Sequence, residues 1–146
     1  MKPIKVIISF IISLNFCFSE DKPDYSFWKI LDENEKITFV KGYYLGLSRS
    51  LNTLKNEAAR MRRQDKFWSP PFSHENSAKI MLEFFSDPMP AYSEIVEMVD
   101  ALYESSDNHK ILIETSLHIL MLHRSGSEAK ANTLLLREQR KVLKGR

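Results

Sequence analysis

The sequence predicts an all-α protein, an antiparallel bundle of about five helices behind an N-terminal signal peptide. Apolar residues recur at spacings of three and four, which is the period of an amphipathic helix. Only four glycines occur in 146 residues, fewer than the turns of an all-β fold usually need. The predicted loops of two to six residues between helices favour antiparallel neighbours.

The first nineteen residues have the composition of a secretory signal peptide. Lys2 and Lys5 supply positive charge ahead of a mostly apolar run, residues 6–18. Cys17 and Ser19 are small residues at the −3 and −1 positions for cleavage after Ser19. The run is shorter than the roughly 20 residues of a membrane-spanning helix. We therefore predict an exported protein, periplasmic or secreted. The alternatives are a retained leader and a lipid-modified Cys17.

Cleavage would change the charge and the cysteine content of the chain. It removes two of the 21 basic residues and none of the 19 acidic ones, so the formal net charge falls from +2 to zero. It also removes the only cysteine, and with it disulfide and thiolate chemistry. The mature protein is therefore expected to bind no nucleic acid and to keep no stable membrane span.

After the signal peptide, residues 1–19, we expect a short lead segment, residues 20–31, and one helical domain, residues 32–146. The strongest periodic pattern predicts a helix over about 33–65, with Asp32 as its N-cap and Glu35 in the capping-box position. Its apolar stripe comprises Ile37, Val40, Tyr44, Leu47, Leu51, Leu54, Ala58 and Met61.

Shorter apolar segments, separated by proline or polar turns, predict four further helices. They span about 74–86, 91–105, 109–124 and 128–143. Ser73 is the expected cap of the first, and Asp107-Asn108 the expected turn and cap before the third. The third is apolar nearly all round, which is typical of a central, buried helix.

Gly42, Gly46 and Ser50 lie four residues apart on one helix face. Small residues at this spacing allow close approach, so we expect another helix to pack there. The alternative is a groove that admits a side chain of a partner protein.

The segment 67–72 contains Phe67, Trp68 and Phe72 beside two prolines. We expect a loop whose aromatic rings pack against the core; rings exposed together would instead indicate an interface. The preceding basic cluster, Arg60, Arg62, Arg63 and Lys66, is interpreted as a solvated helix end that interacts with the helix dipole. The alternative is a site for an anionic partner.

The sequence predicts no catalytic, metal or cofactor residues. Glu114 and His118 are four residues apart and share one helix face, but His123 lies about 140° round the helix and does not complete a metal site. We expect a hydrogen bond or ion pair on the helix surface instead. No glycine-rich phosphate loop or nucleophile elbow is present. The chain is therefore predicted not to be an enzyme.

Two segments resemble uncharacterised small exported bacterial proteins. Residues 39–47 resemble their Gly-Tyr-x-x-Gly helix, and residues 83–90, followed by the 91–105 helix, resemble a Phe-Tyr-x-Asp-Pro…Pro segment. The order of elements also resembles the Tai-type immunity proteins of type VI secretion, helical periplasmic proteins that bind and block peptidoglycan-amidase toxins. The resemblance covers roughly residues 37–105 and implies a helical, periplasmic, non-enzymatic protein. The chain departs from it by lacking the cysteines that many such proteins carry.

These observations predict a periplasmic or secreted helical protein-binding module, with inhibition of the immunity type as its sharpest form. The binding surface would include the Gly42–Ser50 face or the 67–72 loop. A small cell-envelope hydrolase is one alternative, which requires acid or histidine side chains converging in a cleft. A carrier of a small apolar ligand is another, which requires an enclosed cavity between the helices.

Overall fold

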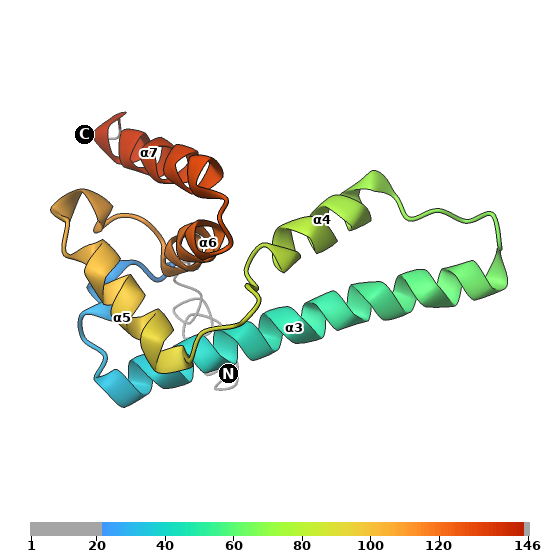
Figure 1. Cartoon of the computed structure of the whole chain (residues 1–146), viewed down its shortest axis with the longest axis horizontal. Coiled ribbons are helices and arrows are strands. Elements are labelled where there is room, and N and C mark those ends of the chain that lie inside the picture. Colours follow the sequence, from blue (N-terminus) through green and yellow to red (C-terminus); the bar gives the residue numbers. More distant parts are fainter. Residues whose placement is uncertain (1–21, 145–146) are drawn as a thin grey trace, which may run out of the picture.

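The structure is a computed structural model that describes residues 22–144, and it shows an all-helical chain over that range (Figure 1). The α-helices are α2 (Tyr25–Trp28), α3 (Glu33–Gln64), α4 (Phe72–Leu82), α5 (Tyr92–Tyr103), α6 (Ile113–Arg124) and α7 (Glu128–Lys144), with a 3₁₀ turn η1 (Ser106–Asn108) before α6. Residues 22–144 contain no strand. The predicted all-α class is therefore confirmed. The predicted signal peptide, 1–19, lies outside the described residues.

The helices form two regions, which we call the body and the arm (Figure 1). The arm, residues 48–82, consists of the second half of α3, the loop that follows it and the whole of α4. Helix α4 runs back alongside α3. The body, residues 22–47 and 83–144, holds α2, the first half of α3 and helices α5 to α7. The arm extends away from the body, and its far end is the loop between α3 and α4. No helix within residues 22–144 has the length and apolar content needed to cross a bilayer.

Helix α3 begins where the sequence predicts. The Asp32 side chain accepts a hydrogen bond from the Glu35 amide at 2.9 Å, and the Glu35 carboxylate accepts one from the Asp32 amide at 2.8 Å. This capping box satisfies two amides that the first turn leaves free. The helix ends at Gln64, one residue before the predicted end.

Helices α5 and α6 supply most of the core of the body. Ile95, Val99, Ile113, Leu117 and Met121 are fully buried. The prediction of a central helix here is confirmed, because half of the residues of α6 are buried.

Contacts with α3, α5 and α6 hold the lead segment against the rest of the body. The Ile113 amide donates to the Pro23 carbonyl at 2.9 Å. The indole Nε1 of the buried Trp28 donates to Asp100 at 2.6 Å, and Lys36 contacts the same carboxylate at 2.7 Å. Residues 22–31 are therefore part of the body.

Two expected helix caps are wrong. Helix α4 begins at Phe72 with Pro71 in the N-cap position and no side-chain cap, so Ser73 lies inside the helix. Asp107 and Asn108 belong to the turn η1, and Leu112 is the N-cap residue of α6. The side chain of Asn108 is engaged elsewhere, because it donates to the Leu102 carbonyl at 2.6 Å and accepts from Gln139 at 2.9 Å.

The expectation of close helix packing at Gly42 and Gly46 is also wrong. Both glycines are exposed, and a Cβ atom added at either would meet no atom within 4 Å. Ser50 donates to the carbonyl of Gly46 in its own helix at 3.0 Å. Helix α5 packs instead on the apolar stripe of α3, where Tyr92 lies against Tyr44. The small-residue face is left open to solvent.

Candidate functional site

An open cleft lies where the arm meets the body, with α4 on one side and α6 and α7 on the other. Its volume is about 770 Å³. The lining consists of Asn76, Lys79, Ile80, Glu83, His118, Ala129, Lys130, Thr133, Leu134 and Arg137. Basic groups outnumber acidic groups in this lining, and apolar side chains lie between them. Lys130 pairs with Glu83 and Arg137 pairs with Glu138, so Lys79 is the lining cation that takes part in no ion pair among residues 22–144.

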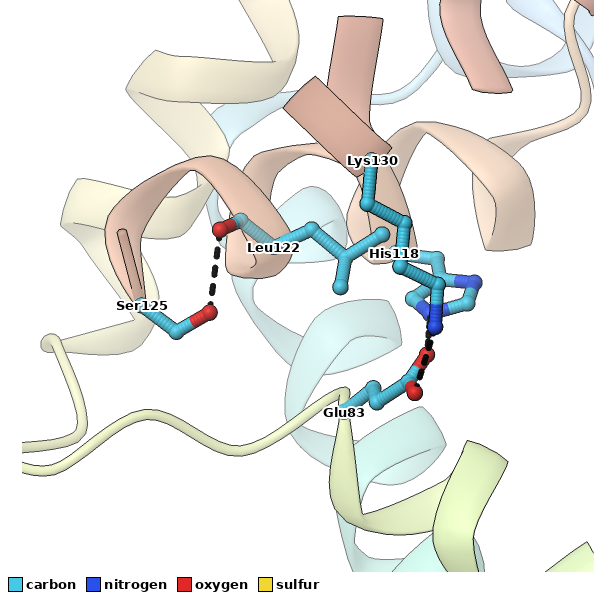
Figure 2. Close-up of polar contacts among 5 residues, drawn as sticks. All are labelled: Glu83, His118, Leu122, Ser125 and Lys130. Atoms are coloured by element: carbon cyan, nitrogen blue, oxygen red, sulfur yellow. Dashed lines mark hydrogen bonds and ion pairs between the residues drawn. The ribbon is translucent and has the colours of Figure 1, made fainter. Parts of the chain in front are cut away.

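Glu83, His118 and Lys130 converge in this cleft from three different elements (Figure 2). One carboxylate oxygen of Glu83 lies 3.0 Å from His118 Nε2, and the other accepts a hydrogen bond from Lys130 Nζ at 2.5 Å. The His118 ring also stacks on Phe84, with ring centroids 4.5 Å apart. Because an ionised carboxylate only accepts hydrogen bonds, His118 Nε2 carries the proton in this contact.

The electrostatics of this cluster keep Glu83 ionised. Burial raises the pKa of the Glu83 carboxyl, but the hydrogen bonds from Lys130 and His118, together with their charges, outweigh burial and bring the net pKa below its ordinary value. The side chains of Glu83 and His118 are both largely buried. The cluster therefore fastens the end of α4 to α6 and α7.

A carboxylate that fixes an imidazole also occurs in acid–base catalysis, where it orients the ring. In those sites the imidazole serves a nucleophile or a positioned water. The cleft lining includes one hydroxyl side chain, Thr133, and neither serine nor cysteine.

The structure places the sequence-derived candidates apart from one another. Glu114 is exposed, and the partner of His118 is Glu83 rather than Glu114. The expected pair along one helix is therefore wrong. The side chain of His123 is exposed. Across residues 22–144, no three histidine, cysteine, aspartate or glutamate side chains lie close enough to hold a metal ion.

The role of Glu83 could not be predicted from the sequence, because Glu83 contacts His118 only in the folded structure. It follows the last residue of α4, and His118 lies in the middle of α6. Helical spacing rules relate residues within one element only. The one local indication in the sequence is that Glu83 lies just before the break at Asp87–Pro90. A helix that ends at such a break places its last side chains near neighbouring helices.

The far end of the arm differs from its predicted packing. Phe67 is 97% exposed and Phe72 is 82% exposed, while Trp68 is half-buried. The expectation that these rings pack against the core is wrong, because α3 carries the loop several turns beyond the body (Figure 1). Phe67 and Phe72 are thus exposed together, the arrangement that the sequence analysis associated with an interface.

The cations at this end are mostly without acidic partners. Arg60 pairs with Glu57 at 2.7 Å. Arg62, Arg63 and Lys66 take part in no ion pair within the described part of the chain. The arm thus ends in exposed aromatic rings next to exposed positive charge.

Comparison with known proteins adds no relative. No family model, curated protein or solved structure matches this chain. The resemblance to Tai-type immunity proteins therefore stays a prediction.

Proposed function

We propose that this chain is an exported, antiparallel helical bundle, made with a cleavable leader, that acts by binding another protein in the cleft between α4 and α7. The observation behind this proposal is that α4 buries none of its eleven residues. Its apolar Ile80 and Leu82 are 42% and 48% exposed. Because helices in proteins are stabilised mainly by packing of one face, a partner that covers α4 would supply the missing burial.

The cleft defines the kind of segment that fits. Two helices facing each other across an open groove can receive a third helix through its apolar face. Ile80 and Leu134 give the groove apolar contact area. Lys79 on α4 adds positive charge without an ion pair in the described chain, whereas Arg137 on α7 pairs with Glu138 at 3.1 Å. We infer a partner segment that is apolar on one face and acidic along its edges.

Inhibition of a secreted enzyme is the sharpest form of this proposal. It draws on the predicted leader, on the resemblance in residues 37–105 and on a cleft able to grip a projecting element of a toxin. The expected partner is then an exported peptidoglycan amidase encoded beside this gene. The inhibitor and the enzyme should form a stoichiometric complex that loses amidase activity.

The test is site-specific photo-crosslinking in the cells that make the protein. A photoreactive residue replaces Ile80 in the cleft, and the matched control carries it at Ile30, which is 72% exposed on the body. We expect one dominant protein adduct from position 80 and none from position 30. Ile80→Glu should weaken the purified complex at least about tenfold through loss of apolar burial. Equal adducts from both positions would argue against the cleft.

A small cell-envelope hydrolase is the second candidate, favoured by the Glu83–His118 contact in the cleft. In that role His118 would activate a water molecule. Purified protein should then release soluble fragments from peptidoglycan, and His118→Gln should abolish the release. Release that survives His118→Gln would exclude this site. Carriage of a small apolar ligand has less support, because the cleft is open rather than enclosed.

A further inference from the structure

We propose that the far end of the arm docks on an anionic phospholipid surface. Phe67 and Phe72 would enter the headgroup region, and Arg62, Arg63 and Lys66 would meet the lipid phosphates. This interaction is separate from the protein-binding cleft, which lies at the opposite end of α4.

The exposure of the two rings is exceptional within this molecule. Among the aromatic residues between 22 and 144, Phe67 and Phe72 are the two whose side chains are exposed. All the others are buried or half-buried, and most of them surround the core of the body. Both exposed rings flank the one loop that lies farthest from the body (Figure 1). Such placement indicates a contact surface rather than incomplete packing.

The charge of this end specifies the sign of the surface. Residues 60–75 contain four lysine or arginine residues against two acidic ones, Asp65 and Glu75. Asp65 accepts a hydrogen bond from the Phe67 amide at 2.9 Å, which orders the start of the loop. Each cation brought near an anionic leaflet strengthens binding about fivefold. Apolar rings beside cations are the combination that interfacial membrane segments use.

The shape of this end favours a bilayer over a folded protein. A specific protein interface buries about 800 Å² on each partner and needs a complementary surface. The arm ends in the loop that joins α3 to α4 and projects away from the body (Figure 1). A bilayer accepts a projecting ring without a preformed pocket, and its apolar boundary lies about 5–10 Å below the headgroups.

The experiment uses the exported protein and vesicles of phosphatidylcholine with or without phosphatidylglycerol. Brominated phosphatidylcholine, which both kinds of vesicle contain, quenches tryptophan fluorescence on contact. Trp68 lies in the docking loop, whereas Trp28 is buried in the body. We expect quenching in anionic vesicles and none in neutral ones. Trp68→Phe should abolish the quenching while vesicle co-sedimentation persists. The quenching reports only on the surroundings of Trp68, so an apolar leader at the N-terminus does not contribute to it.

Three variants separate the contributions of the rings and of the cations to vesicle binding. Replacing both rings, by Phe67→Ser with Phe72→Ser, should lower vesicle affinity at least about tenfold. Changing Arg62, Arg63 and Lys66 to glutamine should lower it to the level that wild type shows at 1 M salt, where the Debye length is about 3 Å. Ile30→Ser with Leu143→Ser, a matched pair of exposed apolar residues on the body, should leave it unchanged.

Several results would overturn the proposal. One is the absence of Trp68 quenching in anionic vesicles. Another is an equal loss of affinity in the Ile30/Leu143 control. A third is a protein adduct from a photoreactive residue at position 67 together with no vesicle binding, which would assign this end to a protein partner.

Discussion

The central helices of the body and the helices of the arm follow similar amphipathic patterns, yet they differ in how much each helix buries. The last helix of the body, α7, buries one of its seventeen residues. In the body, α5 buries four of its twelve residues and α6 buries six of its twelve. In the arm, α4 buries none, and Leu51 is the last buried residue along α3. A local pattern is therefore enough to define a helix, whereas burial requires a neighbour on its apolar face.

The largest expected effect comes from truncating one leucine in each region. Leu117→Ala in the body should lower the free energy of unfolding by about 2–5 kcal/mol, because a fully buried side chain leaves a cavity. Leu54→Ala in the arm, where the side chain is half-buried, should cost less than half as much. Urea unfolding followed by circular dichroism measures both. Equal costs would mean that the arm is packed as well as the body.

The two tryptophans provide the next comparison. Trp28→Phe removes the hydrogen bond to Asp100 and the contact with Lys36, so we expect a loss of about 1.5–3 kcal/mol. Trp68→Phe in the arm should change the free energy of unfolding by less than about 0.5 kcal/mol. Thermal unfolding of both variants checks the difference. A larger loss of unfolding free energy for Trp68→Phe than for Trp28→Phe would mean that the arm is packed more tightly than the body.

The junction between the regions should depend on pH. The pKa of Glu83 is lowered from 4.5 in the folded chain, so its ionised form stabilises the fold above about pH 4.5, and this contribution is lost as pH falls through the folded pKa. Glu83→Gln should therefore cost about 1 kcal/mol at neutral pH and progressively less below pH 4.5. Urea midpoints across this pH range test it. A cost that stays the same from pH 7 to below pH 4.5 would contradict this account.

The smallest expected effect concerns two tyrosines in the body. The buried Tyr44 hydroxyl has no hydrogen-bond partner among the described residues, so Tyr44→Phe should raise the free energy of unfolding by up to about 1 kcal/mol. The Tyr103 hydroxyl donates to the Ile111 carbonyl at 2.7 Å, so Tyr103→Phe should lower it. Opposite signs in a denaturant titration support this account. A loss in both variants would contradict it.

The elements that sequence predicted well are those fixed by local rules. The start of α3 follows from Asp32 and Glu35, and its buried side follows from the spacing of Val40, Tyr44 and Leu51. Hydrogen bonds at a cap and the period of a helix involve neighbours in sequence only. The predicted bounds of α5 and α7 are correct within two residues for the same reason. The predicted end of α4 at 86 and the predicted start of α6 at 109 are wrong, because α4 ends at Leu82 and α6 begins at Ile113.

The candidate site depends on contacts that local rules do not contain. Glu83, His118 and Lys130 meet because α4, α6 and α7 end or pass at one junction. The expectation that Phe67 and Phe72 would be covered failed because a sequence shows the type of a residue but not its distance from the core. The same limit explains why the open face at Gly42 was expected to be packed.

The bond between the Ile113 amide and the Pro23 carbonyl sets a condition on folding order. A polypeptide leaves the ribosome or a translocation pore from its N-terminal end. Helix α2 therefore emerges long before α6, whose first residue, Ile113, binds the Pro23 carbonyl. Until α5 and α6 have followed, the indole of Trp28 and its apolar neighbours are available to a chaperone. Any shortened chain that stops before Ile113 should consequently be captured by chaperones or degraded by proteases.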